Sequence, residues 1–127
     1  MTTALWCLMI AGWLPIVCAG ISKWGASDFD NAHPREWLEK QEGYRKRANA
    51  AQQNSWEAFL WFGIAVVVAM ITKADPQWLN MLAVVFIASR LAFIGFYLAN
   101  WSTARSLAWL LGFFTTIAIF ASGSSAV

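Results

Sequence analysis

Residues 48–72 read ANAAQQNSWEAFLWFGIAVVVAMIT, and this stretch decides the fold. It contains 25 residues and one charged side chain, Glu57. A helix crosses a hydrocarbon core of about 30 Å with roughly 20 residues, so the stretch predicts a transmembrane helix with a carboxylate inside it. Residues 76–104 form a similar stretch, because Arg90 is the single charge that interrupts it. Each stretch therefore predicts a membrane-spanning helix with one charge near its middle.

Two further stretches, 4–21 and 106–127, contain 18 and 22 residues without any charge. The whole chain of 127 residues is 59% hydrophobic, more than an ordinary soluble domain of this length needs. The first stretch has no basic segment before it and contains two Trp, which argues against a cleaved signal peptide. We therefore predict an all-α integral membrane protein, a single domain (1–127) folded as an antiparallel four-helix transmembrane bundle. The expected helices are 3–21, 48–72, 77–101 and 106–123, with a cytoplasmic loop at 22–47.

The basic residues outside the apolar stretches predict the orientation. Six of the eight lie in the loop 22–47, and Arg105 lies in the third loop, whereas the second loop offers only Lys73. By the positive-inside rule the first and third loops are cytoplasmic, and both termini lie on the other side. A formal net charge of +2 does not indicate a nucleic-acid partner. The basic loop residues are instead expected beside the headgroups of membrane lipids.

The loop 22–47 is long enough to contain a short helix that begins at Pro34. Its Trp37 and Leu38 are then available to lie on the membrane surface. The same loop carries three residues of metal-binding type that lack both a fixed helical spacing and a fourth ligand, namely Asp28, Asp30 and His33. No metal site is predicted.

The second loop, residues 72–75, ends in Asp followed by Pro and predicts a tight turn. The second and third helices therefore form an antiparallel hairpin. Glu57 is ten residues from Arg47, and Arg90 is eleven from Trp101, so both charges lie about 15 Å from the cytoplasmic surface. A charge at such depth costs roughly 2.5 to 3.5 kcal/mol and requires a partner. We predict a buried ion pair between Glu57 and Arg90, which either only fixes the helix register or also serves function.

Two stripes of side chains lead from this predicted pair toward the cytoplasm. Residues three and four apart share a helix face. The second helix carries such a stripe at Arg47, Ala50, Ala51, Asn54, Glu57 and Ala58, and the third carries one at Arg90, Phe93, Tyr97 and Trp101. Arg105 follows where the third loop meets the fourth helix. A polyanionic ligand with an apolar co-substrate would fit this boundary.

The pattern Arg47-x-x-Ala50-Ala51-x-x-Asn54-x-x-Glu57, with Arg90-x-x-Phe93-x-x-x-Tyr97 and then Arg105, resembles the MAPEG superfamily. These are the membrane-associated proteins in eicosanoid and glutathione metabolism, and the chain is similar to bacterial members. The resemblance covers all four predicted helices. It implies a homotrimer of four-helix subunits in the bacterial inner membrane. Glutathione would bind in a cleft between neighbouring subunits at the cytoplasmic side.

The resemblance also implies roles for individual residues. Asn54 and Glu57 would bind the γ-glutamyl end of glutathione, and Tyr97 would form a hydrogen bond with the peptide. Arg105 would correspond to the catalytic arginine that stabilises the thiolate, because a neighbouring guanidinium favours the charged form of a thiol. Arg47 and Arg90 complete the expected binding set.

Three functions remain open at this stage, and the sequence does not decide whether the protein is an enzyme. The first is a glutathione-dependent transferase or peroxidase that acts on apolar electrophiles. The second is a non-catalytic membrane scaffold or accessory subunit. It is favoured by Ala50, where the eukaryotic enzymes usually have arginine, and by Phe93, where they often have tyrosine or histidine. The third is a small proton-coupled exporter in which Glu57 alternately binds a proton and a cation.

Overall fold

The computed structural model describes residues 1–123, which contain five helices and no strand. Four helices of this described part are long and apolar enough to cross a membrane: α1 (Thr3–Lys23), α3 (Tyr44–Ile71), α4 (Pro76–Leu98) and α5 (Ser102–Phe120). The short helix α2 (Pro34–Glu39) lies in the loop between α1 and α3. The predicted all-α membrane fold is confirmed.

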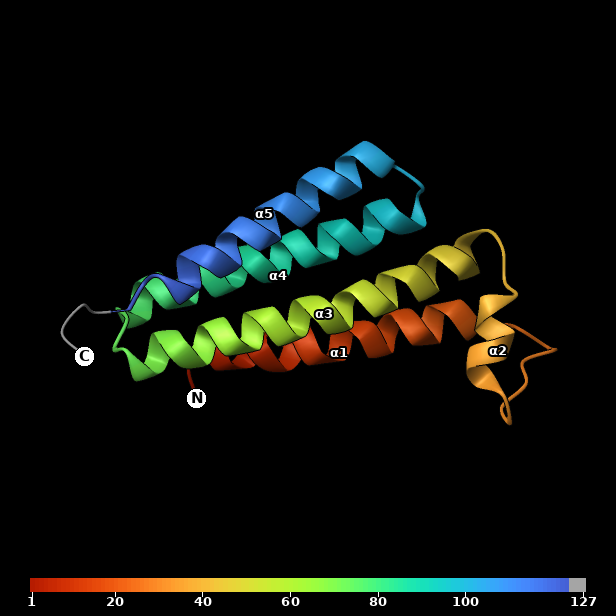
Figure 1. Ribbon diagram of the computed structural model, residues 1–127, viewed down its shortest axis with the longest axis horizontal. Helices are drawn as coiled ribbons and strands as arrows, with labels where there is room; N and C mark the ends of the chain where they lie inside the picture. The colour runs from red at the N-terminus through yellow and green to blue at the C-terminus, as the bar shows by residue number, and fades with distance from the viewer. Residues whose placement is uncertain (124–127) are drawn as a thin grey trace.

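The four long helices run along the long axis of the molecule (Figure 1). α1 packs along α3, and α4 packs along α5, while α3 also contacts both α4 and α5. α2 lies at one end of the bundle, and the turn between α3 and α4 lies at the other (Figure 1). Because consecutive long helices run in opposite directions, the chain forms the antiparallel bundle that the sequence predicts.

The turn between α3 and α4 is tight, as predicted. Lys73 adopts a positive φ of 59°, which ends α3 within residues 72–75. The side chain of Asp75 then accepts a hydrogen bond from the Trp78 N–H at 2.9 Å, and so caps the first turn of α4. These local interactions fix α3 and α4 as neighbours.

Several helix ends differ from the predicted ones. α3 begins at Tyr44 rather than at 48, because its basic first turns extend the helix beyond the apolar run. α4 ends at Leu98 rather than at 101, because Asn100 adopts a φ of 62° and breaks the helix. α5 spans Ser102–Phe120 rather than 106–123. Hydropathy marks the part of a helix that lies in hydrocarbon, whereas backbone hydrogen bonds set where the helix begins and ends.

The interior of the bundle combines small residues with one aromatic stack. Phe62 of α3 and Phe86 of α4 stack with ring centroids 4.0 Å apart and an interplanar angle of 5°. α1 and α3 contribute buried alanines, which let the two helices approach closely: Ala4, Ala11, Ala48, Ala51, Ala65 and Ala69. The Asn80 side chain accepts a hydrogen bond from the Ala4 N–H at 2.9 Å, tying the start of α1 to α4.

α2 forms where the sequence predicts it, but its apolar residues do not lie on the membrane surface. Trp37 and Leu38 are buried. Phe29 meets the Trp37 ring edge to face, with ring centroids 5.0 Å apart, and Lys23 lies over the Phe29 ring. Phe29 of the loop is therefore the aromatic partner of Trp37, and α2 packs against α3 instead of facing lipid.

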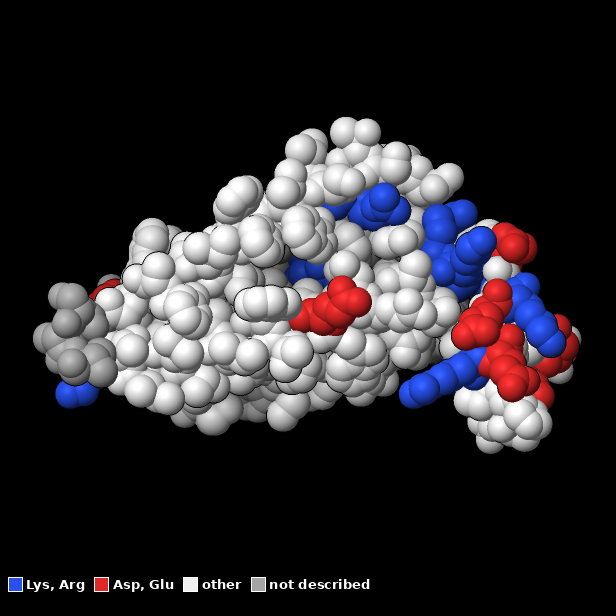
Figure 2. Space-filling model, viewed as in Figure 1, with Lys and Arg blue, Asp and Glu red and all other residues white. Residues whose placement is uncertain are grey.

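The charged side chains gather at the end of the molecule that carries α2 (Figure 2). The rest of the body is mostly uncharged, with a small group of acidic and basic atoms near its middle (Figure 2). This distribution is the one expected of a bundle that crosses a membrane. The placement of both termini outside the cytoplasm stays a prediction.

Candidate functional site

A cavity of about 390 Å³ opens between α3 and α5, with two side chains of α4 in its wall. Three charged or amide side chains border it, Asn54 and Glu57 from α3 and Arg90 from α4. The Thr116 hydroxyl of α5 also borders it, but it donates a hydrogen bond to the Gly112 carbonyl oxygen of its own helix. Most of the remaining wall is apolar and includes Trp61, Ile64, Phe113, Ile117 and Phe120. Asn54 and Glu57 precede the apolar α3 residues in sequence, so the polar part of the cavity lies toward the end that carries α2. The cavity is therefore polar at one end and apolar along the rest of its length.

Arg90 is a nearly buried cation, with 3% of its surface exposed. Its Nη2 donates a hydrogen bond to Ser55 Oγ at 3.1 Å. Its Cζ lies 4.2 Å from the ring centroid of Phe93, one turn further along α4. These contacts place a neutral hydroxyl and an aromatic face around the guanidinium, and both stabilise a cation without neutralising it.

The predicted ion pair between Glu57 and Arg90 is wrong in this structure. Within residues 1–123, no carboxylate oxygen lies within 4.0 Å of the Arg90 nitrogens, and the Glu57 side chain is exposed. The two residues do border the same cavity, so their matched depth is correct. The prediction is wrong about which side chain of α3 points at Arg90. Ser55 and Glu57 are two residues apart, so their side chains point in directions about 200° apart around α3. Ser55 faces the Arg90 guanidinium, whereas Glu57 lies at the exposed rim of the cavity.

Asn54 carries a buried oxygen without a partner. Its Oδ1 atom is inaccessible and accepts no hydrogen bond, although the residue borders the cavity. Gln52, two residues earlier on α3, has a buried Oε1 in the same state. Buried polar atoms normally find partners, so Asn54 would gain a hydrogen bond if its amide turned toward a donor in the cavity. No motif or spacing in the sequence marks Gln52 as a candidate site residue.

Arg47 lies apart from the cavity wall and contacts the end of α4. Its Nε and Nη2 atoms both donate to the Leu98 carbonyl oxygen, at 3.2 and 3.1 Å. Leu98 is the last residue of α4, where carbonyl groups lack helical partners. Arg47 therefore caps α4 from α3, and its predicted role in ligand binding stays a prediction.

Tyr97 and Arg105 meet at the same end of the bundle, near the junction of α4 and α5. The Cζ of Arg105 lies 4.4 Å from the centroid of the Tyr97 ring. Neither residue is in the cavity wall. Arg105 lies four residues before Trp109, which does line the cavity, so it stands about 6 Å further along the helix axis. The structure thus brings Asn54, Glu57 and Arg90 to one cavity and leaves Arg105 outside its wall, beyond the Phe93 and Tyr97 rings.

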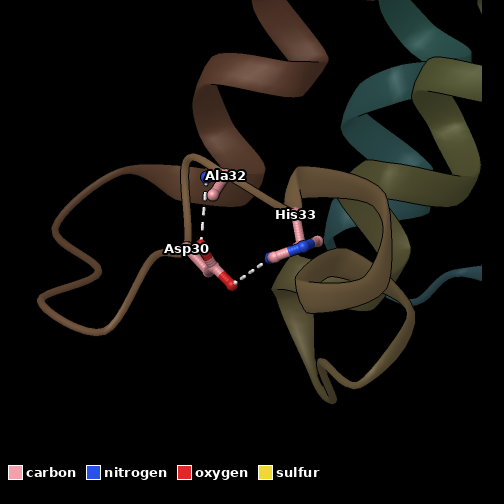
Figure 3. A network of polar contacts seen from close by, with 3 residues as sticks. All are labelled: Asp30, Ala32 and His33. Atoms are coloured by element: carbon pink, nitrogen blue, oxygen red, sulfur yellow. Dashed lines mark hydrogen bonds and ion pairs between the residues drawn. The ribbon is translucent and has the colours of Figure 1, made fainter.

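Asp30 and His33 of the first loop form a local turn rather than a ligand cluster (Figure 3). Asp30 accepts a hydrogen bond from the Ala32 N–H at 3.0 Å, and its other oxygen lies 3.1 Å from His33 Nδ1. These contacts join residues three or fewer positions apart and organise the entry to α2. Across the described residues, no group of three His, Cys, Asp or Glu side chains is placed to hold a metal ion.

The fold and the cavity define a four-helix integral membrane protein with charged side chains inside its membrane-spanning region. The family model described as MAPEG family matches residues 3–123, and the chain therefore belongs to this family. The match confirms the resemblance that the Asn54 and Glu57 pattern indicates, and it agrees with the four-helix membrane bundle. No curated protein and no solved structure matched the chain.

Proposed function

We propose that this protein is a glutathione-dependent transferase or peroxidase that acts on apolar electrophiles. The polar end of glutathione would occupy the cavity between α3 and α5. The observation that carries the proposal is that Arg90 and Glu57, both within the described residues, border one cavity without forming an ion pair. A cation and an anion that face the same space without neutralising each other favour a zwitterionic ligand.

The γ-glutamyl end of glutathione is such a zwitterion, because one carbon carries both an ammonium and a carboxylate group. The guanidinium of Arg90 would bind the carboxylate, since its planar donors match two carboxylate oxygens. Glu57 would accept a hydrogen bond from the ammonium, and the unpartnered Oδ1 of Asn54 would accept another once its amide turns toward the cavity. An unsatisfied buried oxygen costs about 1 to 3 kcal/mol, so a bound donor at Asn54 would stabilise the complex.

The thiol would then lie toward Arg105, and the acceptor substrate would lie along the apolar wall. Arg105 stands about one turn before the cavity wall on α5, where its charge would favour the thiolate form. In a transfer reaction the thiolate sulfur forms a bond to an electrophilic carbon of the substrate, and the leaving group departs with the electron pair. The aromatic and aliphatic wall around Phe113 and Ile117 suits an acceptor that partitions into lipid.

Assembly as a homotrimer in a bacterial inner membrane is part of the same proposal. The described surface carries large exposed aromatic side chains midway along α1 and α3, including Trp13, Trp56 and Trp61. Indoles at that depth are far from the headgroup zone that tryptophan favours. Contacts with neighbouring subunits would account for them, and cross-linking in native membrane would count the subunits.

The proposal is tested by calorimetric titration of the purified protein in nanodiscs with glutathione and with S-methylglutathione. Both ligands carry the γ-glutamyl zwitterion, so both are expected to bind, and only glutathione supports turnover. Arg90→Met and Glu57→Gln should each weaken binding about tenfold or more, the effect of one hydrogen bond to a charged group. Lys73→Gln removes a charge at the opposite end and should leave binding unchanged. Absence of binding to the wild-type protein at millimolar glutathione would overturn the proposal.

A non-catalytic scaffold is the second candidate, and Phe93 favours it. The Phe93 side chain is 3% exposed and packs beneath the Arg90 guanidinium. It offers no hydroxyl or imidazole for chemistry at the position where the eukaryotic enzymes of the superfamily often have tyrosine or histidine. Ala50 likewise offers no guanidinium. An intact oligomer that shows neither glutathione binding nor turnover would support the scaffold.

The exporter hypothesis gains one observation, because the exposed Glu57 carboxylate has no arginine partner within 4.0 Å in the described chain. Arg90 borders the same cavity, however, and would repel a cationic substrate. This function therefore ranks below the other two. Proteoliposomes with an imposed pH gradient would test it, since export of a lipophilic cation that Glu57→Gln abolishes would favour it.

A further inference from the structure

Four side chains form a continuous row from the middle of α4 toward its end. The Cζ of Arg90 lies 4.2 Å from the Phe93 ring centroid, and the rings of Phe93 and Tyr97 meet edge to face with centroids 5.5 Å apart. The Cζ of Arg105 lies 4.4 Å from the Tyr97 ring centroid. The Arg90 guanidinium thus contacts the Phe93 ring, and the Arg105 guanidinium contacts the Tyr97 ring. The two rings also pack against each other.

The sequence spacing explains the row. Arg90, Phe93 and Tyr97 are three and four residues apart, so they share one face of α4. Arg105 reaches this face from the first turn of α5, because the turn between the helices is closed by a hydrogen bond from the Trp101 N–H to the Phe96 carbonyl oxygen at 2.9 Å. Phe93 is nearly buried and backs the Tyr97 ring, which fixes the plane on which Arg105 lies.

Arg105 has no carboxylate within 4.0 Å among the residues that the structure describes. Its close contact with the Tyr97 ring is therefore a specific interaction that limits where the guanidinium points. Guanidinium groups stack on aromatic faces because the negative face of the ring attracts the cation.

We propose that the ring of Tyr97, and not its hydroxyl, positions Arg105, so that Tyr97 is a positioning residue for this guanidinium. The consequence for thiolate chemistry rests on the proposed function, whereas the contact itself does not. A role of Tyr97 as a hydrogen-bond donor to the bound peptide makes the opposite prediction for Tyr97→Phe, which keeps the ring and removes the hydroxyl.

The contact is tested without any glutathione, by following phenylglyoxal modification of Arg105 in the oligomer in nanodiscs and measuring the labelled peptide by mass spectrometry. Tyr97→Leu should accelerate labelling of Arg105 about two- to fivefold, the size of a partly exposed cation–π contact. Tyr97→Phe should label at the wild-type rate. The second tyrosine provides a matched control, because Arg45 lies over the Tyr44 ring at 5.2 Å. Tyr44→Leu should therefore change labelling of Arg45 and leave that of Arg105 unchanged.

Faster labelling of Arg105 in Tyr97→Phe would overturn the proposal even if Tyr97→Leu fails to fold. Equal labelling in wild type and in folded Tyr97→Leu would also overturn it. These labelling outcomes decide the contact whether or not glutathione binds, so failure of the proposed function is recognised separately, by the calorimetric titration.

The functional consequence has its own readout, the pH at which bound glutathione shows half of its thiolate absorbance. This midpoint should rise in Tyr97→Leu and stay at the wild-type value in Tyr97→Phe. Binding of S-methylglutathione should be equal in both variants. A general packing defect would weaken binding of both ligands without a selective change in the midpoint.

Discussion

The arrangement of Arg90 and Glu57 leads to a quantitative prediction for the pair of variants Arg90→Met and Glu57→Gln. Arg90→Met loses the hydrogen bond to Ser55, worth about 1.5 to 3 kcal/mol for a charged donor, and the contact with Phe93, worth about 0.5 to 2 kcal/mol. It also removes a cation from the middle of the membrane, which relieves roughly 2.5 to 3.5 kcal/mol. These terms oppose each other, so the net change in the free energy of unfolding should lie between a gain of about 1.5 kcal/mol and a loss of about 2.5 kcal/mol.

Glu57→Gln replaces an exposed side chain and should change the free energy of unfolding by less than about 1 kcal/mol. Because the two residues make no direct contact, the double variant should be additive to within about 1 kcal/mol in ligand-free protein. A buried, contacting ion pair would instead cost about 3 to 5 kcal/mol in each single variant, and much of this loss would disappear in the double variant.

The measurement is SDS titration of the protein in mixed micelles, followed by far-ultraviolet circular dichroism, for wild type, both single variants and the double variant. Saturating glutathione should introduce a coupling that is absent without it, because one ligand then contacts both residues. A coupling energy of 3 kcal/mol or more in the ligand-free protein would refute the reasoning. Glu57 and Arg90 would then neutralise each other, and the case for a zwitterionic ligand would be lost.

Three further predictions follow from other parts of the molecule. A reporter that is active only in the cytoplasm should be silent at either terminus, and a strong signal from one terminus would reverse the orientation. Gly112→Ala places a Cβ 2.8 Å from Ser89 Oγ and should lower the free energy of unfolding by about 1 to 3 kcal/mol in the same titration. Gly95→Ala is its control, because the new Cβ meets no atom within 4 Å and should be neutral or stabilising. Arg105→Ala should lower turnover of a halogenated aromatic more than it lowers glutathione affinity, and an equal loss in both would contradict a role at the reacting sulfur.

The sequence predicts depth in the membrane well, because depth increases regularly with residue number along a helix. Glu57 and Arg90 accordingly border the same cavity, as their positions indicate. The sequence predicts rotation about the helix axis poorly, because a membrane helix is apolar on every side and its pattern does not mark which face is buried. The partner of Arg90 is therefore Ser55, which an apolar pattern does not distinguish from its neighbours.

The contact between the ends of α3 and α4 near the first and third loops could not be predicted from the sequence either. Arg47 belongs to the stripe that the second helix carries at three- and four-residue spacing, yet it donates to the carbonyl oxygen of Leu98. That contact exists because α4 ends earlier than hydropathy indicates, at a turn set by the positive φ of Asn100. Where a helix ends determines which carbonyl groups are free, and the apolar pattern does not contain that information.

Contacts at both ends of the hairpin hold α3 and α4 together. At one end residues 72–75 form the tight turn, and at the other Arg47 holds the carbonyl oxygen of Leu98. Moving α3 away from α4 would break the hydrogen bonds from Arg47 to that carbonyl oxygen and the stacking of Phe62 on Phe86. α5, which forms the opposite wall of the cavity, packs along α4 and also contacts α3. The three helices that line the cavity are therefore held to one another, and widening the cavity by moving α5 sideways would break its contacts with both α3 and α4.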